Sequence, residues 1–305
     1  MKINNSSLES ISQFKHINKF SLFNKNDELG CVNCFIFPIN SKGFDYSLIE
    51  ECLLPSIPEF TLSAHTRILY ESNPMKLSQV AREQFKEALK NKGELGELLL
   101  FCFLEGYLKA PKILTKYDLK TSKNMPVHGS DGIHLKKYND NSYYLIFGES
   151  KTYSKLKDAI KDAFKSIVEF MREVNHSGDK KSGIHFERGL LSRHIEKDVF
   201  EEDDKDVLEA LVYPSKKTID ISINDAFGIF IGYEIQITDE QKILTDKAFK
   251  ESIEKSVIKQ VTGIKQYIID EIKKSGLLGS PFYIFVLPFT EIDESRKRIL
   301  EDVLR

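Results

Sequence analysis

The sequence predicts an α/β protein with a mixed central sheet flanked by helices. Apolar segments of strand length alternate with segments of helical period along most of the 305 residues, a pattern typical of this class. Two strand segments, 133–138 and 143–147, are joined by a turn and should pair antiparallel. A third apolar segment at 281–288 lies between two helical segments and is predicted to be a buried strand.

The composition indicates a globular protein without an overall affinity for nucleic acid. Hydrophobic residues make up 41% and charged residues 30%, with a net charge of -2. Basic residues gather locally instead: residues 109–165 hold twelve lysines and six acidic residues. Any DNA-binding surface is therefore expected to be local.

The chain is expected to be cytoplasmic and not bound to a membrane. It has no apolar run near the ~20 residues that cross a bilayer, and its start lacks the apolar region of a signal peptide. Four cysteines do not make a disulfide framework in a chain of this length. Cys31 and Cys34 have metal-ligand spacing, but their segment is more typical of an apolar strand than of a zinc site.

Residues 1–75 are predicted to form an N-terminal region of unknown role, followed by a main domain at 76–305. The first region should hold loose helix and loop to residue 30, a strand at 31–39 and a short helix at 45–54. Pro55 and Pro58 end that helix. Residues 60–71 are predicted to form a pair of strands.

The main domain begins with a helix from Lys76, interrupted at 91–93, and a second helix at 94–109. The second helix is apolar all round, which predicts burial. Its acids Glu94, Glu97 and Glu105 share one narrow stripe, and a carboxylate on a buried helix needs a partner or a metal. Glu97 is expected to point inward because Phe101 and Leu104 flank it one turn later, although Glu94 remains a candidate.

The hairpin that follows a short strand at 112–117 brings chemical groups together. If it folds about Asp140, Tyr138 faces Ser142, Ile133 faces Phe147 and Asp131 faces Glu149. Lys151 shares the face of Glu149 and Asp131 if the strand extends that far. Opposed like charges destabilise a sheet, unless a cation such as Mg²⁺ joins them. With a lysine beside them, these carboxylates suggest metal-assisted phosphodiester hydrolysis.

The Glu-x-Lys tripeptide is not informative by itself. It also occurs at Glu240/Lys242 and at Glu271/Lys273. The copy at Glu149 differs because an apolar strand precedes it and an aspartate stands at the mirrored position of the hairpin.

The remaining chain should contain one long helix at 154–174, three strands and two further helices. Three lysines, Lys157, Lys161 and Lys165, repeat every four residues on the outer face of the first helix. They are candidates for contact with a DNA backbone, or form a solvated ridge. The strands are expected at 208–213, 218–223 and 227–237, and the helices at 242–274 and 291–304.

This order of elements and motifs resembles the PD-(D/E)xK, or restriction-endonuclease-like, nuclease core. The motifs are Gly-Glu-Leu-Gly-Glu at 93–97, Gly-Ser-Asp-Gly-Ile-His at 129–134 and Phe-Gly-Glu-Ser-Lys at 147–151. Together they are most similar to the nuclease subunit of the Hachiman anti-phage defence system, over about residue 76 to the C-terminus. The proline of the motif name is absent, and Ser130 precedes Asp131.

The resemblance implies a DNA nuclease that depends on Mg²⁺ (or Mn²⁺) and works with a superfamily 2 helicase in antiviral defence. It implies Asp131 and Glu149 as metal ligands and Lys151 as the group that orients or deprotonates the attacking water. Glu97, the fourth catalytic candidate, would brace Lys151 or support a second ion.

Two other classes of function stay open. A non-cleaving module that binds DNA ends or structures would keep the same fold and lysines. A small-molecule or protein-binding α/β scaffold would need neither metal nor DNA.

Overall fold

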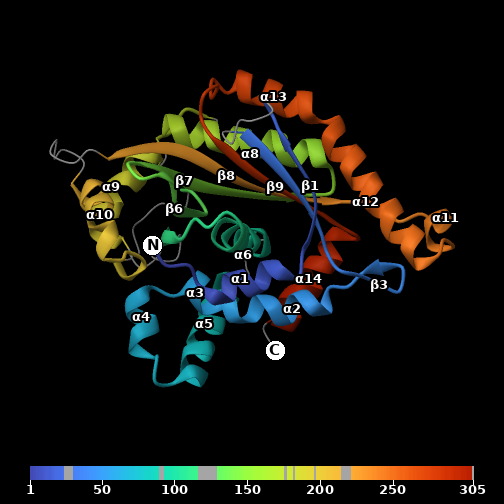
Figure 1. Cartoon of the computed structure of the whole chain (residues 1–305), viewed down its shortest axis with the longest axis horizontal. Helices are drawn as coiled ribbons and strands as arrows, with labels where there is room; N and C mark the ends of the chain where they lie inside the picture. Colours follow the sequence, from blue (N-terminus) through green and yellow to red (C-terminus); the bar gives the residue numbers. More distant parts are fainter. Residues whose placement is uncertain are drawn as a thin grey trace.

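A computed structural model describes residues 1–23, 30–88, 93–115, 129–174, 177–180, 183–195, 197–213 and 221–303. One sheet runs through the molecule (Figure 1), with the strand order β1-β2-β9-β8-β7-β6-β5. Its strands are β1 (Lys15–Ser21), β2 (Gly30–Ile36), β5 (Lys112–Thr115), β6 (Gly132–Asn139), β7 (Ser142–Tyr153), β8 (Ser222–Glu234) and β9 (Phe282–Phe289). β3 (Ile39–Asn40) and β4 (Gly43–Phe44) form a separate small ribbon.

The sheet is mixed, as the sequence predicts. β2, β9, β8 and β7 are parallel neighbours, whereas β1, β6 and β5 pair antiparallel at the two sides. Every residue of β2 and of β9 is buried. Parallel strands covered on both faces have such continuous apolar sequences.

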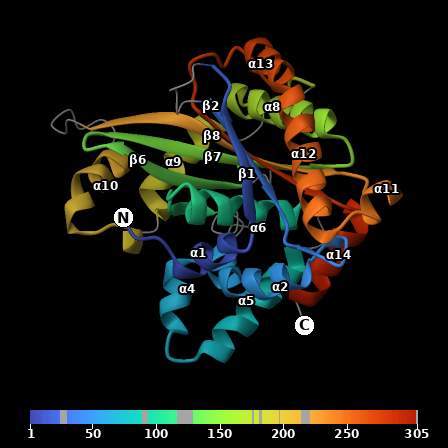
Figure 2. The same ribbon diagram turned by 45° about the vertical axis from the view of Figure 1, so that its right-hand side comes forward.

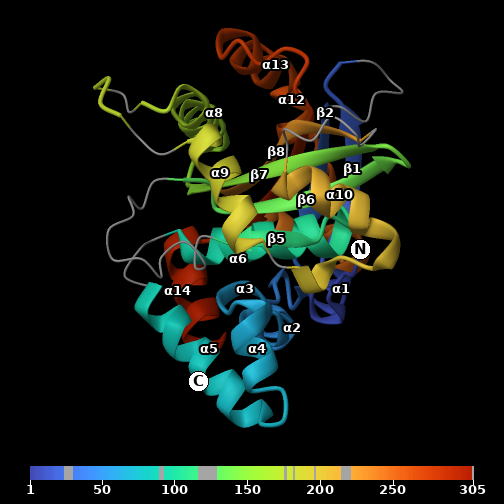
Figure 3. The same ribbon diagram turned by 90° about the vertical axis from the view of Figure 1, so that its left-hand side faces the viewer.

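Helices cover both faces of this sheet, as the side view in Figure 3 shows. The face that carries α6 (Glu94–Cys102) is also covered by α1 (Asn5–Ser12), α2 (Ser47–Leu53), α3 (Ile57–Thr61), α5 (Pro74–Ala88) and α14 (Ile292–Val303). The opposite face is covered by α8 (Leu156–Arg172), α9 (Ile184–His194), α10 (Lys205–Val212), α12 (Asp246–Gly263) and α13 (Lys265–Lys274). Smaller helices are α4 (Ala64–Leu69) and α11 (Asp239–Lys242). No helix of the described residues has the length and apolar character of a membrane span.

The N-terminal region is built into the same sheet. β1 and β2 precede residue 76, yet β2 pairs with β9 from the end of the chain (Figure 2). The backbone N–H and the side-chain amide of Asn4 both donate to Glu105, at 3.0 and 2.8 Å. The hydrogen-bonded sheet and this contact therefore cross the predicted boundary at residue 75.

Two predicted strands are helices. Residues 60–71, predicted as a strand pair, lie in α3 and α4. Pro58 suits the first turn of α3, and the Ser63 hydroxyl caps α4 by accepting from the Thr66 N–H. Residues 208–213 were predicted as a strand but belong largely to α10, where Val207 and Leu211 are buried one helical turn apart.

The other main elements follow the sequence. The strand at 31–39, the helices near 76, 94, 154, 242 and 291, and the strand at 281–288 are confirmed within a few residues. β1 lies in a region predicted as loose helix and loop. Parts of two predicted strands, 116–117 and 218–220, lie outside the described residues. The strands predicted separately at 218–223 and 227–237 are joined in the single strand β8, because residues 222–233 pair with β7 without interruption.

α6 lies close to the sheet because glycines form part of the contact. A Cβ atom on Gly96 would lie 3.1 Å from Thr152 Oγ1 and 3.3 Å from Ser150 Oγ, and one on Gly228 would lie 2.7 Å from Leu104 Cδ2. The helix then continues into a π-helical turn, Phe103–Tyr107. This packing places Glu97 beside the end of the hairpin.

Candidate active site

β7 carries the two central groups of the candidate site on one side of the sheet. The strand stays paired with β8 to its end, where Tyr153 lies opposite Tyr233. The condition for Glu149 and Lys151 to share a face is thus confirmed. Residues at the alternate positions Tyr143, Leu145 and Phe147 join the core cluster that contains α8, so Glu149 and Lys151 face α8.

The hairpin keeps the predicted register from Lys137 to Ile133. Ile133 lies opposite Phe147 as predicted, whereas the register shifts near the turn and Asn139, not Tyr138, lies opposite Ser142. Such an irregularity changes pairing locally. At the mouth, the ladder of paired residues ends at Ile133 and Phe147, and the Asp131 N–H donates to the carbonyl of Gly148 instead of that of Glu149. The predicted pair of Asp131 and Glu149 is therefore not part of the ladder, because Asp131 precedes the first residue of β6.

Asp131 is fixed at this mouth by three hydrogen bonds. Its N–H donates to the carbonyl of Gly148 at 2.9 Å. Its Oδ2 accepts from the N–H and the hydroxyl of Ser150, at 2.8 and 3.0 Å. Ser150 points to the α6 face, where a Cβ atom on Gly96 would lie 3.3 Å from its Oγ. The Asp131 carboxylate, bonded to Ser150 and lining a pocket with Glu97, therefore lies on the α6 side, whereas the sequence predicts the same face as Glu149 and Lys151.

Glu149 forms a close ion pair with Lys151, with 2.6 Å between Oε1 and Nζ. The Glu149 side chain is 15% exposed and the Lys151 side chain 21% exposed. Burial, and then the negative charge of Asp131, raise the pKa of Glu149, although Lys151 opposes this shift. The two carboxylates therefore affect each other electrostatically, and a cation beside them would relieve the repulsion.

Lys151 has a second acidic neighbour, which no sequence motif indicates. Its Nζ lies 3.5 Å from Oδ2 of Asp162 on α8. Burial lowers the pKa of Lys151, but the charges of Glu149, Asp131 and Asp162 outweigh it and raise that pKa. Glu149 and Asp162 thus hold Lys151, a role that the family resemblance implies for Glu97.

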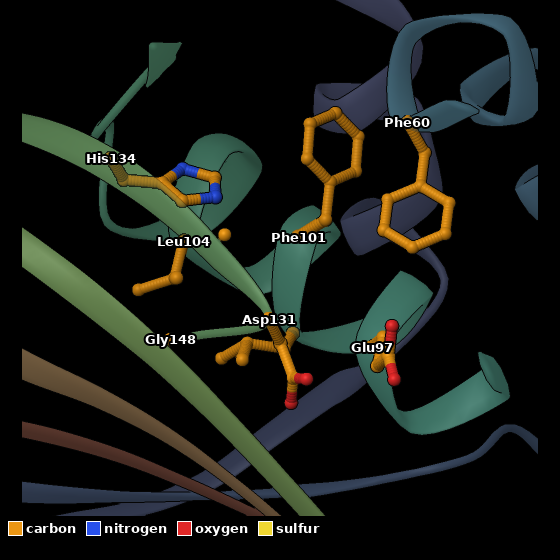
Figure 4. A pocket seen from close by; sticks show the side chains of 9 residues that line it. Phe60, Glu97, Phe101, Leu104, Asp131, His134 and Gly148 are labelled. Carbon is orange, nitrogen blue, oxygen red and sulfur yellow. The ribbon is translucent and has the colours of Figure 1, made fainter. Parts of the chain in front are cut away.

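Glu97 instead shares a small pocket with Asp131, which Figure 4 shows between β6 and α6. Phe60, Phe101 and His134 are among the other lining residues. The space open to the centre of a water-sized sphere is about 10 Å³, about that of one water molecule. Glu94 is fully buried one turn earlier, so the pocket favours Glu97 as the acid of this helix.

His134 does not supply a base in this pocket. Burial lowers its pKa to about 4, and its Nδ1 lies 2.8 Å from the carbonyl of Ala110. A histidine with this pKa is neutral at pH 7. Its ring therefore shapes the pocket wall.

Glu187 on α9 holds the segment that enters the site. Its carboxylate accepts from the N–H of Ser130 at 2.7 Å and from the Ser130 hydroxyl at 2.5 Å. Burial raises the pKa of Glu187 to about 7, and the charge of Asp131 adds to the shift. A Cβ atom on Gly129 would overlap the Glu187 carboxylate at 1.8 Å, so a glycine there lets the two segments meet. No motif in the sequence pointed to Glu187, which lies 57 residues beyond Ser130.

The three candidate DNA-backbone lysines are exposed along α8. Lys157 Nζ lies 5.5 Å from the ring centroid of Tyr267, and Lys165 lies 4.0 Å from Glu169. Lys161 directly precedes Asp162, the residue that contacts Lys151. The row therefore runs beside the candidate site.

The donor set suits magnesium better than zinc. Within the described ranges, no group of three or more His, Cys, Asp or Glu side chains is arranged to hold a metal. Mg²⁺ commonly uses only one or two carboxylates, with water and substrate phosphate completing its shell, and Asp131 and Glu149 supply two. Cys31 and Cys34 point into different core clusters on opposite faces of β2, so they do not form half of a zinc site.

Comparisons with known proteins give one match. A family model described as HamA matches residues 11–303 of the chain. No curated protein and no solved structure matches.

Proposed function

The chain belongs to the HamA family of the Hachiman anti-phage defence system, and on this basis we propose that it is a Mg²⁺-dependent DNA nuclease with a restriction-endonuclease-like core. One observation carries the proposal. At the mouth of the hairpin the Asp131 carboxylate accepts from the N–H of Ser150, the residue between Glu149 and Lys151, and Lys151 pairs with Glu149 at 2.6 Å. This arrangement of two carboxylates and a lysine matches the chemistry that phosphodiester hydrolysis requires.

Each side chain has a defined role in the proposed reaction. Asp131 and Glu149 would hold Mg²⁺, which when bound polarises the scissile phosphate and activates water. Lys151 is cationic because its pKa is raised, so it serves as a donor that orients water and stabilises negative charge on the phosphate. Glu97, in the pocket with Asp131, would support a second ion.

The proposed system includes a partner and a substrate surface. Family membership places the chain in a defence system, and we propose a superfamily 2 helicase as the partner that brings DNA to the site. The lysines at 157, 161 and 165 would contact the DNA backbone. With a net charge of -2, the chain alone should bind DNA weakly, because few phosphates are neutralised.

The test is cleavage of plasmid DNA with Mg²⁺ and the helicase partner present. Lys151→Ala should lower the rate by about 10²–10⁴-fold, the contribution of a well-placed proton-transfer or donor group. Glu271→Ala, at another Glu-x-Lys, is the matched control and should cleave at the wild-type rate. Wild-type cleavage by folded Lys151→Ala would end the nuclease proposal. DNA binding by the wild type without any cleavage would favour a non-cleaving module.

A further inference from the structure

Asp162 forms an ion pair with Lys151. Among the described residues, no other acidic side chain of α8 does so. Asp162 lies at the middle of the helix, its side chain is 35% exposed, and it belongs to none of the sequence motifs. The Tyr153 hydroxyl donates to its Oδ2 at 2.8 Å. The same oxygen lies 3.5 Å from Lys151 Nζ. Tyr153 of β7 therefore holds the Asp162 carboxylate in place, and that carboxylate faces Lys151 of the same strand.

Lys151 and a divalent cation compete for the same carboxylate. Lys151 Nζ lies 2.6 Å from Glu149 Oε1, and the proposed function uses Glu149 as a metal ligand. A cation at Glu149 would repel the ammonium group at this short range. The Lys151 side chain is only 21% exposed, so its ammonium group cannot lose its partner without a cost, because a partly buried charge needs a counter-ion.

We propose that Asp162 is a positioning residue that receives Lys151 when a divalent cation occupies Glu149. The inference rests on the proposed function and adds a step to it. Lys151 moves its ion pair from Glu149 toward Asp162, which Tyr153 keeps oriented. The lysine stays charged and beside the site, and Glu149 becomes available to the metal.

A Mn²⁺ titration of the full chain, followed by calorimetry, tests this transfer without measuring activity. Asp162→Asn keeps the side-chain volume and an oxygen for the Tyr153 hydroxyl, but removes the charge that receives Lys151. Mn²⁺ affinity should fall by about two- to fivefold, the size expected for one ion pair near the surface. Asp158→Asn, an exposed acid one turn earlier on α8, makes the same change in net charge and should leave the affinity nearly unaltered.

The same substitution in a Lys151→Ala background separates positioning from direct attraction. Without the lysine, Asp162→Asn should have little effect on Mn²⁺ affinity. An equal loss in both backgrounds would overturn the inference, because Asp162 would then act on the metal by itself. Unchanged affinity for Asp162→Asn in the presence of Lys151 would also overturn it.

The failure of this inference is distinguishable from that of the proposed function. If the wild type binds Mn²⁺ and Glu149→Gln weakens that binding, the metal site stands whatever Asp162 does. If the wild type binds no Mn²⁺, both ideas are overturned together.

Discussion

The tripeptide Glu-x-Lys has different geometry in β7 and in α13. In the strand, residues two apart share a face, and Glu149 pairs with Lys151 at 2.6 Å. In the helix, residues two apart point about 200° apart, and Glu271 pairs with Lys274 at 2.7 Å instead of with Lys273. In α11, Lys242 likewise pairs with Asp239, at 3.4 Å, within one helical turn. The tripeptide brings its two charges together only where the backbone is extended.

The surroundings increase this difference. The strand copy has Asp131 across the hairpin and Asp162 from α8 beside it. The helical copy at Glu271 has an exposed lysine one turn later as its ion-pair partner. The proposed cation site thus combines groups from the strand, the opposing segment and the covering helix.

The largest expected effect comes from neutralising the strand glutamate. Glu149→Gln should lower Mg²⁺-dependent cleavage by at least about 100-fold, because the proposed metal site loses one of its two carboxylates. High Mn²⁺ should recover only a trace of the rate. Glu271→Gln is the control and should cleave normally. Equal cleavage rates for these two variants would show that the Glu-x-Lys tripeptide in β7 has no special role compared with the one in α13.

A second variant tests the contact between Glu187 and Ser130, which holds the segment that enters the site beside Glu149. Glu187→Ala leaves the Ser130 N–H and hydroxyl without their shared acceptor, and should lower the free energy of unfolding by about 1–3 kcal/mol. Urea denaturation measures this change. Glu251→Ala, at an exposed position of α12, should stay within about 0.5 kcal/mol of the wild type. A Glu187→Ala protein as stable as this control would show that the Ser130 contact does not hold the segment.

The buried carboxyl of Glu187 also predicts a pH dependence. Its pKa is about 7 in the folded chain, above the ordinary value of a glutamate, so the folded state binds a proton that the unfolded state has lost. Stability should therefore decrease as pH rises from about 4.5 to about 7. In Glu187→Gln this decrease in stability should be smaller. Part of the decrease remains, because the pKa of Glu149 is also raised in the folded chain. Urea midpoints at pH 5, 6 and 7 without metal measure it, and identical slopes would contradict the assignment.

The smallest effects are expected on DNA binding, from the lysines of α8 that lie beside Glu149 and Lys151. Lys161→Ala and Lys165→Ala should each weaken DNA binding a few-fold at low salt and reduce the salt slope by about one. Fluorescence anisotropy over a range of salt concentrations measures both quantities. Lys259→Ala, exposed on α12, provides the matched change in charge. If it had the same effect, the row on α8 would be an ordinary solvated ridge.

Local sequence determined the features that depend on chain period and turn chemistry. The turn at 139–141 and the alternation of the two strands correctly placed Ile133 opposite Phe147 and Lys151 beside Glu149. One error of register, Asn139 opposite Ser142, lies at the turn. The apolar residues of α6 lie all round the helix, and they correctly predicted its burial. A helix of this kind on the surface would expose some of its apolar residues to water in any orientation.

Only the tertiary structure decided which distant residues complete the site and the sheet. Short apolar segments such as 60–71 and 208–213 suit a strand or a helix about equally, and packing made them helices. Most residues of β1 are polar or half-exposed, and its sequence does not indicate a strand. Pairing with β2 makes this segment a strand. Glu187 and Asp162 reach Ser130 and Lys151 from separate helices, through contacts between segments whose spacing along the chain carries no signal. Hydrogen bonds and ion pairs of this kind depend on how helices pack on the sheet, and local sequence does not specify that packing.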